Sequence, residues 1–417
     1  MYNKVEAKLN LPDVDKEILD FWDKDNTFKK SVENRKDAKP FVFFEGPPGL
    51  NGMPHIGHCM SRVFKDLVLR YKAMKGFYVE RRAGWDTHGL PVELKAEKEL
   101  NIKNKQELEK VGMEDFINKC KEVLNTYEKV WRDTSKTIGF WVDLDNAYMT
   151  YKDEYIESVW WSLKQMFNQK LLFKGYRVAP YCPRCGTSLA EHEVAQGYQK
   201  VTDKTLFVKF KVKGEENTYF IAWTTTPWTL PSNVALCVNP EFDYSLIKVG
   251  DEKYILATQL ADKLFEEYET ISTFKGSTLV GKEYQPLFTL PEKYYQGNKG
   301  WFVTSADYVT LTDGSGIVHI APAFGEDDYE VGKKFNLPFI QLVDEAGNMK
   351  EDIKEYAGLN HRIANDKIIE DLKSQGKVLK VVKYEHDYPH CWRCKTPLMY
   401  YAREGWFIKM SDFRSQL

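Results

Sequence analysis

The sequence predicts an α/β protein whose first part, a parallel sheet with helices, is interrupted by a mainly β insertion. Two observations carry this prediction. A buried-strand pattern, a glycine-rich loop and an amphipathic-helix pattern follow one another early in the chain, which is typical of a parallel α/β unit. Strand-like alternation then dominates from about residue 200 to residue 384, and a Cys-x-x-Cys pair stands at each end of that region.

The first element is a strand over residues 41–46, where the run "FVFFEG" places four apolar residues before a turn cluster. A helix is predicted over 57–76. Its apolar residues recur at steps of three and four, and they are Met60, Val63, Phe64, Leu67, Val68 and Tyr71. Gly76 stands where a C-terminal cap is expected. The opening stretch is therefore a strand–loop–helix element.

The following elements continue this alternation. "YVERRAGWDTHGLPVE", residues 78–93, predicts a second short strand and its loop, and residues 152–173 predict a long amphipathic helix that ends before Gly175. From about Lys200, runs such as "KTLFVKFKVKG" and "NTYFIAWTTTP" are rich in alternating Thr, Val, Tyr and Phe. A separate, mainly β domain is therefore predicted up to about Tyr384.

The composition excludes several classes of protein. With 417 residues, of which 43% are hydrophobic and 29% charged, the chain is long enough for two or three domains and too apolar to be disordered. No apolar run approaches the ~20 residues of a membrane span, and the N-terminus lacks the apolar core of a signal peptide, so a cytoplasmic location is expected. The net charge of -2 predicts that any nucleic acid binds through a local basic patch.

The stretch "EGPPGLNGMPHIGH", residues 45–58, has the composition of an anion-binding loop. Its four glycines let the backbone approach a ligand closely. His55 and His58 lie three residues apart at the start of the predicted helix, where unpaired N–H groups and the helix dipole favour phosphate. The pattern predicts a phosphate site, with two incidental loop histidines as the alternative.

Four of the seven cysteines form two pairs, Cys182 with Cys185 and Cys391 with Cys394. In a cytoplasmic chain this spacing favours a metal over disulfides. Zn²⁺ takes four thiolates in tetrahedral geometry, and each Cys-x-x-Cys supplies two of them from one turn. One closed, structural zinc site is therefore expected at the neck of the insertion, with two unligated buried pairs as the alternative.

Two further stretches carry polar groups that could form sites. "WTTTPWTLP" collects hydroxyl groups where a proline turn ends a strand, although composition alone favours a plain strand edge. Asp86 follows a strand beside a tight turn and could accept an ammonium group, although without further context a loop-capping role is favoured. No Gly-x-Ser-x-Gly elbow is present, so any ester hydrolysis is expected to use a positioned water.

Several motifs together resemble those of a known enzyme family. "PPGLNGMPHIGH" resembles the His-Ile-Gly-His signature of class I aminoacyl-tRNA synthetases. "GWDTHGLPVE", "YCPRCGTSLAEHEV", "WTTTPWTLPSN", "GSGIVHIAPAFGEDDY" and "PHCWRC" occur in the order seen in isoleucyl-tRNA synthetases. The resemblance implies the first half of a Rossmann-like nucleotide-binding fold, interrupted by a mainly β editing domain. It implies a ligase that activates isoleucine with ATP and Mg²⁺, transfers it to tRNA(Ile) and hydrolyses misactivated valine.

The resemblance also implies roles for individual residues. Those expected to bind ATP are Gly46, Pro47, His55, Gly57 and His58, of which His55 and His58 act in catalysis. Those expected to bind the amino acid are Gly46, Pro47 and Asp86, with Asp86 on the α-ammonium group. The editing pocket would comprise Thr224, Thr225, Thr226, Trp228, Thr229, His319 and Asp328, where His319 limits side-chain size and Asp328 accepts the α-ammonium group. A structural zinc would be held by Cys182, Cys185, Cys391 and Cys394.

The resemblance divides the chain into five segments. They are the first half of the catalytic domain (1–175), the first part of the zinc neck (176–200), the editing domain (201–384), the second part of the neck (385–400) and the re-entry into the catalytic domain (401–417). The Lys-Met-Ser-Lys-Ser loop of class I enzymes is missing. The stretch "IKMSD", residues 408–412, is similar to it but carries Asp412 where the second lysine of the motif should be. An N-terminal fragment is therefore expected, monomeric and without full synthetic activity. The alternatives are a valyl-tRNA synthetase fragment, a stand-alone editing deacylase and a tRNA-binding module.

Overall fold

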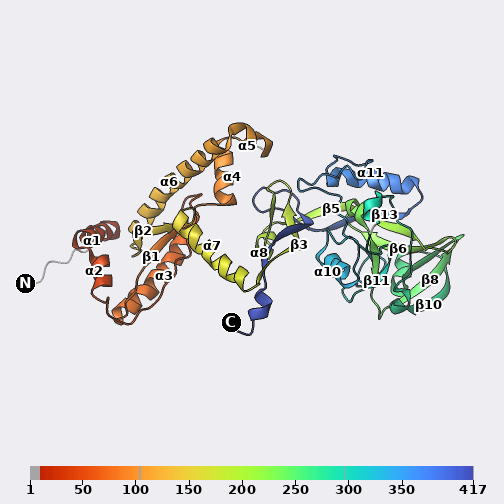
Figure 1. Ribbon diagram of the computed structural model, residues 1–417, viewed down its shortest axis with the longest axis horizontal. Helices are drawn as coiled ribbons and strands as arrows, with labels where there is room; N and C mark the ends of the chain where they lie inside the picture. The colour runs from red at the N-terminus through yellow and green to blue at the C-terminus, as the bar shows by residue number, and fades with distance from the viewer. Residues whose placement is uncertain (1–9, 103–104, 296, 417) are drawn as a thin grey trace, which may run out of the picture. The chain divides into compact units, whose positions relative to one another are not determined.

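The chain folds into two compact units, Met1–Leu172 and Phe173–Leu417, in a computed structural model that describes residues 10–102, 105–295 and 297–416 (Figure 1). The first unit alternates helices with short parallel strands. The second is built around one large sheet in which antiparallel pairs predominate. The predicted α/β class, a Rossmann-like first part interrupted by a mainly β insertion, is confirmed.

The first unit has its strands in parallel. β1 (Arg82–Trp85) pairs with β2 (Asp143–Met149), and isolated parallel bridges join Pro40 to Tyr78, before β1, and Gly49 to Asp86, directly after it. The helices are α1 (Leu11–Asp25), α2 (Thr27–Glu33), α3 (Ile56–Met74), α4 (Leu90–Glu99), α5 (Lys105–Val111), α6 (Met113–Thr137) and α7 (Asp153–Asn168). This order places the glycine-rich loop between a sheet segment and the N-terminus of α3.

The prediction of a strand over residues 41–46 is wrong, because none of these residues lies in a regular strand. Backbone hydrogen bonds join this segment to its neighbour at Phe41 and at Leu50, whereas most residues between these two lie in no strand. Pro47 and Pro48 lack the N–H groups that a regular ladder needs. The segment therefore follows the sheet through contacts at its two ends.

Helix α3 agrees with the prediction in its bounds and its cap, but a different side of it is buried. Gly76 has a φ of 89°, and its N–H donates to the carbonyl of Ala73 at 3.0 Å, as expected of a C-terminal cap. Leu69 and Ala73 are buried in a cluster with Val79. The apolar residues of the periodic pattern are 48–64% exposed, namely Met60, Val63, Phe64, Leu67, Val68 and Tyr71.

The helix predicted over residues 152–173 ends earlier than expected. α7 stops at Asn168, Lys170 adopts a left-handed φ of 59°, and β3 (Leu172–Cys182) begins at once. The apolar run at 171–173 fits the helical period as well as a strand, so sequence pattern alone extends the helix too far.

The second unit contains, among its described residues, a nine-stranded sheet. Seven strands follow the order β10-β8-β9-β6-β12-β7-β11, and β5 joins the sheet by pairing with β6 and β13. The strands are β5 (Tyr198–Lys211), β6 (Thr218–Thr224), β7 (Ala235–Val238), β8 (Asp243–Val249), β9 (Glu252–Ala257), β10 (Glu269–Lys275), β11 (Phe302–Ser305), β12 (Ile317–Ile320) and β13 (Val378–Pro389). Its core is rich in Val, Leu and Ile from these strands.

Short helices complete the second unit, and α11 packs beside β13 (Figure 1). The α-helices are α8 (Glu191–Val194), α9 (Ala261–Leu264), α10 (Glu326–Lys334) and α11 (His361–Ser374). The 3₁₀ helices are η1 (Pro227–Ser232), η2 (Thr258–Leu260), η3 (Gly276–Leu279), η4 (Glu292–Tyr294) and η5 (Met410–Phe413). Within the part of the chain that the structure describes, no helix is both long enough and apolar enough to span a membrane.

A smaller sheet lies at the neck of the insertion. β3 pairs with β4 (Thr187–Ser188) on one side and with β14 (Met399–Ile408) on the other. The antiparallel pair β5–β13 leads from this neck to the large sheet, with Tyr198 opposite Pro389 at the neck end. Both cysteine pairs border these strands, so the pairing brings them to one place.

Candidate functional site

The two histidines of the glycine-rich loop lie together at the N-terminus of α3. His55 is the N-cap, and its Nδ1 accepts a hydrogen bond from the N–H of Gly57 at 3.1 Å. The N–H of His55 donates to Nδ1 of His58 at 3.2 Å, and the two ring centroids are 3.7 Å apart. Because Nδ1 accepts in both rings, each neutral ring carries its proton on Nε2 and can donate it to an anion.

Residues outside the motif support His58. The ring of Trp131, on α6, meets His58 edge-on at 4.8 Å. Arg62 is 5% exposed, lies over the Trp131 ring and donates to Oγ of Ser135 at 2.5 Å. Burial, followed by repulsion from the neighbouring imidazole and from Arg62, lowers the pKa of His58. His58 is therefore neutral at neutral pH. No motif in the sequence indicates the supporting roles of Arg62 and Trp131.

The remaining residues of the predicted nucleotide loop leave space for a ligand. Gly46 is exposed, and a Cβ built on it would meet no atom within 4 Å. Pro47 is half-buried. Gly57 is exposed in the first turn of α3, where a Cβ would lie 3.0 Å from the His55 ring. A side chain at Gly57 would therefore disturb the position of that imidazole.

Asp86 lies beside the same loop. Its N–H donates to the carbonyl of Pro48 at 3.0 Å, and its carbonyl accepts from the N–H of Leu50 at 3.1 Å. The residue is half-buried, and Oδ1 lies 3.5 Å from Oγ1 of Thr150. The structure thus brings Asp86 to the loop as expected for a shared site, and it adds Thr150, which no local pattern indicates.

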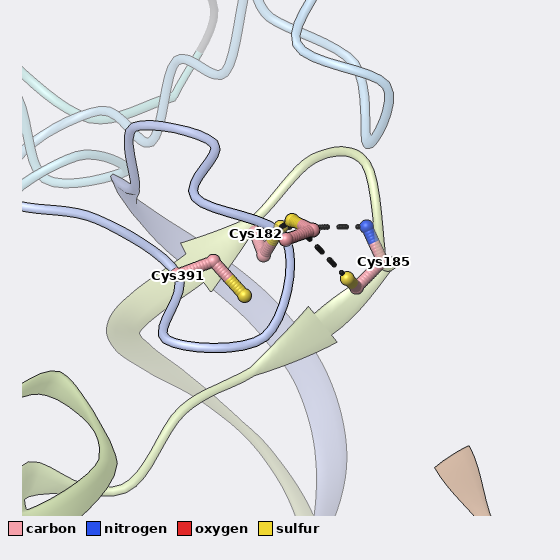
Figure 2. A group of neighbouring side chains, drawn as sticks. Cys182, Cys185 and Cys391 are labelled. Carbon is pink, nitrogen blue, oxygen red and sulfur yellow. Dashed lines mark hydrogen bonds between the residues drawn. The ribbon is translucent and has the colours of Figure 1, made fainter. Parts of the chain in front are cut away.

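The four predicted metal ligands converge at the neck, and three of them are labelled in Figure 2. Their Sγ atoms all lie within 4.8 Å of one another. Sγ of Cys394 is 3.5 Å from the Sγ atoms of both Cys182 and Cys185. Four thiolates with Zn–S bonds of ~2.3 Å in tetrahedral geometry are separated by about 3.8 Å. The donor set of these cysteines therefore fits one four-coordinate metal ion.

Both Cys-x-x-Cys pairs adopt the same turn. The N–H of Gly186 donates to the carbonyl of Cys182 at 2.9 Å, and the N–H of Lys395 donates to the carbonyl of Cys391 at 2.8 Å. Gly186 and Lys395 have positive φ values of 69° and 62°. A residue in the left-handed conformation thus closes each of the two turns. In the first pair, the N–H of Cys185 also donates to Sγ of Cys182 at 3.4 Å.

Three threonines of the "WTTTPWTLP" run form a chain of hydroxyl contacts with His319. Thr224 ends β6, Thr226 precedes η1, and Thr229 lies within η1. Oγ1 of Thr226 is 3.5 Å from that of Thr224 and 3.3 Å from that of Thr229. Nε2 of His319, on β12, is 3.1 Å from Oγ1 of Thr229 and 3.4 Å from Oγ1 of Thr224. Thr225 is half-buried in the same loop.

Trp228 joins this threonine loop to two other segments. Its buried ring meets the ring of Phe324 at 5.0 Å and that of His361 at 4.8 Å, edge-on in both cases. The backbone N–H of Trp228 donates to Oδ1 of Asn365 at 2.9 Å. His361 and Asn365 both lie on α11, so this helix supports the loop from outside the motif. No local sequence pattern indicates either residue, and Asn365 is 137 residues further along the chain than Trp228.

Asp328 lies in the first turn of α10 and is half-buried. Its Oδ2 accepts a hydrogen bond from the N–H of Ala321 at 2.9 Å, which ties α10 to the segment that leaves β12 after His319. Burial raises the pKa of the Asp328 carboxyl to about 7. Burial also lowers the pKa of His319 to about 4. A neutral imidazole and a readily protonated carboxyl therefore occupy the same region, and a bound cation would favour the carboxylate form.

We expect Asp328→Asn to gain stability relative to the wild type as the pH rises from 5 to 8. The folded pKa of Asp328, about 7, lies above the unfolded value of 3.8. The stability contributed by this carboxyl is thus fully present below pH ~3.8 and is lost as the pH rises through ~7, whereas an amide does not titrate. Urea unfolding at both pH values measures the difference. Asp327→Asn, at the exposed neighbouring position, is the control, and a pH-independent difference for Asp328→Asn would contradict the expectation.

Comparison with known proteins finds relatives over the whole chain. A family model described as "tRNA synthetases class I (I, L, M and V)" matches residues 17–417. The isoleucine–tRNA ligases of Clostridium novyi and Thermus thermophilus are 52% and 49% identical to the chain, over 100% and 98% of it, but only 40% and 39% of their own length is covered. The crystal structure of GlLeuRS-CP1 aligns over its whole length with 44% of this chain, at 14% identity and a TM-score of 0.36. From the match over residues 17–417, the chain belongs to the class I tRNA synthetases of the isoleucine, leucine, methionine and valine group.

Proposed function

We propose that this chain is the N-terminal part of an isoleucine–tRNA ligase, with part of the ATP-dependent activation site and a hydrolytic editing pocket. Relatives that are about 50% identical over the whole chain carry that name. The chain spans about 40% of their length. The observation that carries the proposal is the hydroxyl chain of Thr224, Thr226 and Thr229 against a buried, neutral His319.

A second, hydrolytic site has a physical purpose in such an enzyme. Valine differs from isoleucine by one methylene, which is worth only ~1–3 kcal/mol in an apolar pocket, and this amino-acid pair is itself the case from which that limit is known. A pocket that admits valine and excludes isoleucine can remove the error by hydrolysing valyl-tRNA(Ile).

The proposed editing pocket supplies each group that ester hydrolysis needs. Asp328 accepts the α-ammonium group of the valyl ester, and His319 limits the size of the side chain. The threonine hydroxyls, with Thr225 and Trp228 completing the wall, orient a water that adds to the ester carbonyl. They and nearby backbone N–H groups stabilise the oxyanion until the bond from the carbonyl carbon to the ribose oxygen breaks, and the proton lost by the added water passes to that oxygen. All of these residues belong to the second unit, so hydrolysis needs no side chain of the first.

The N-terminus of α3 is the proposed ATP site, with Mg²⁺ bound to the phosphates as part of the substrate. Nε2–H of His55 and Nε2–H of His58 donate to phosphate oxygens whose charge grows as the aminoacyl-adenylate forms. Gly46, Pro47 and Gly57 let the loop backbone approach the nucleotide. The neutral state of His58 matches this donor role.

Isoleucine is the proposed amino acid, held through its α-ammonium group by the carboxylate of Asp86 and bordered by Gly46 and Pro47. A charge-assisted hydrogen bond of this kind is stronger than one between neutral groups. We propose tRNA(Ile) as the macromolecular partner of the parent enzyme, which acts as a monomer in the cytoplasm.

Exposed apolar side chains on the first unit support an incomplete activation site. Besides the exposed apolar residues of α3 described above, Phe44 is 87% exposed, and Trp160 and Trp161 on α7 are 67% and 65% exposed. Contiguous apolar surface is usually covered by another part of a protein or by a partner. We propose that further segments of a longer enzyme cover these side chains and complete the site.

The 417-residue chain alone should therefore form little aminoacyl-adenylate. The expected result is isoleucine-dependent ATP–pyrophosphate exchange far below that of a full-length isoleucine–tRNA ligase tested in parallel, because the 417 residues span only about 40% of the length of such enzymes and the proposed activation site needs further segments. Robust exchange by the purified chain would refute this proposal.

We further propose that Zn²⁺ binds at Cys182, Cys185, Cys391 and Cys394. The sulfur separations fit a tetrahedral thiolate site, and four protein ligands leave no open position. When bound, zinc would cross-link the thiolates and supply no catalytic chemistry. Its role would be to hold the two ends of the insertion together.

One zinc per chain is expected in the purified protein, and Cys391→Ser should lose most of it, because a serine hydroxyl is a much weaker zinc ligand than a thiolate. Metal analysis by mass spectrometry provides the measurement. Cys120→Ser, which lies outside the cluster, should keep its zinc. A wild-type chain that is folded and free of metal would remove the site.

Asp328→Ala should weaken binding of a non-hydrolysable valyl-adenosine analogue. Loss of a charge-assisted hydrogen bond of ~1.5–3 kcal/mol corresponds to a loss of affinity of about 10- to 150-fold. Calorimetric titration of the wild type, Asp328→Ala and the control Asp327→Ala provides the test, with folding checked by circular dichroism. Equal affinities in equally folded proteins would exclude Asp328 from the pocket.

A further inference from the structure

A carboxylate outside the cysteine cluster contacts the second cysteine pair. Glu193 lies on α8, which follows the first pair. Its Oε2 accepts a hydrogen bond from the N–H of Ala190 at 3.0 Å. Its Oε1 accepts from Nε1 of Trp392 at 3.1 Å and forms an ion pair with the guanidinium of Arg393. Trp392 and Arg393 are the two residues between the cysteines of the second pair.

The arrangement of these contacts favours a rigid link between α8 and the second cysteine pair. The bond from Ala190 is half of a capping box, so it holds the carboxylate against its own helix while Oε1 reaches across. The side chains of Glu193 and Arg393 are 17% and 14% exposed, which reduces screening of the ion pair by solvent. Nη1 of Arg393 also lies 3.4 Å from Oγ1 of Thr187, two residues after the first pair. Arg393 thus contacts both α8 and Thr187, which follow the first cysteine pair.

A backbone contact strengthens the same connection. The N–H of His390 donates to the carbonyl of Gly197 at 2.9 Å, directly before the second pair. A Cβ built on Gly197 would lie 1.8 Å from the carbonyl oxygen of His390, so only glycine permits this approach. None of these contacts uses a thiol. The two halves of the neck are therefore linked by groups other than the proposed metal ligands.

We propose that Glu193 is a positioning residue for the metal centre, which holds Trp392 and Arg393 so that Cys391 and Cys394 keep their ligand geometry before the ion binds. The inference rests on the proposed zinc site. A turn that is already ordered loses less conformational freedom on binding, which raises affinity. Glu193 acts through the spacer residues of the turn and touches no sulfur in the contacts described above.

The test compares zinc affinity in the full chain and three variants. Metal-free protein under reducing conditions is titrated with Co²⁺, whose absorption spectrum reports tetrahedral thiolate coordination, and Zn²⁺ affinity is measured by competition with a chromophoric chelator. Glu193→Ala should weaken Zn²⁺ binding about 10- to 100-fold, the usual effect of removing an outer group of a metal site. Glu193→Gln should lose less, because its single amide oxygen keeps part of the hydrogen bonding. Glu191→Ala, at an exposed position on the same helix, should match the wild type.

A double-mutant cycle tests whether the effect passes through the contact with Arg393. If it does, Glu193→Ala combined with Arg393→Ala should bind Zn²⁺ about as well as the weaker single variant, whereas fully additive losses would overturn the inference. Should Glu193→Ala fail to fold, Trp392→Phe keeps the ring and removes one donor, and it should weaken binding about 2- to 10-fold.

The test distinguishes failure of the proposed zinc site from failure of the positioning role of Glu193. A wild-type chain that binds neither Co²⁺ nor Zn²⁺ would remove the proposed zinc site, and the role of Glu193 with it. A wild-type chain that binds both ions, together with Glu193→Ala and Trp392→Phe variants of equal affinity and unchanged Co²⁺ spectrum, would leave the zinc site intact and overturn the positioning role alone.

Discussion

The antiparallel pairing of β5 with β13 is the interaction on which the second unit depends. It starts with Tyr198 opposite Pro389 and continues to Val208 opposite Val378, so it joins the two ends of a long insertion. Side chains alternate in direction along both strands, and a slip by one residue would turn every buried side chain outward, which specifies the register strongly. Once this pairing forms, most of the entropy of closing the insertion has been lost, and short-range contacts at the neck can form at little further cost.

The candidate sites of both units lie where regular elements begin or end. His55 starts α3, Thr224 ends β6, and Asp328 lies in the first turn of α10. At such places backbone groups lack partners within their own element, so side chains and ligands can reach them. Burial then tunes these groups, since it keeps His319 neutral and makes the pKa of Asp328 about 7. The large sheet of the second unit supplies the rigid support for its loops.

Local sequence pattern predicted much of the candidate sites. The two cysteines of each pair share one turn, and His55 and His58 share the N-terminus of α3, because spacing within one turn determines how such neighbours meet. The two cysteine pairs come together through the pairing of β5 with β13. Supporting residues could not be found in the same way. Asn365 binds the backbone of Trp228 across 137 residues, and no period or motif near Asn365 indicates that contact. Such partners are set by the packing of α11, which depends on the whole sheet.

The sequence by itself determined most of the element types, their order and the spacing of the motif residues, because periodicity, turn residues and ligand spacing act over a few neighbouring residues. Tertiary structure decided which side of α3 is buried, where α7 gives way to β3, and that Glu193 meets Trp392 and Arg393. The periodic spacing of the apolar residues of α3 is equally compatible with a buried face and with an exposed face. Burial depends instead on which surfaces the sheet presents to the helix, and that is a property of residues far apart in the chain.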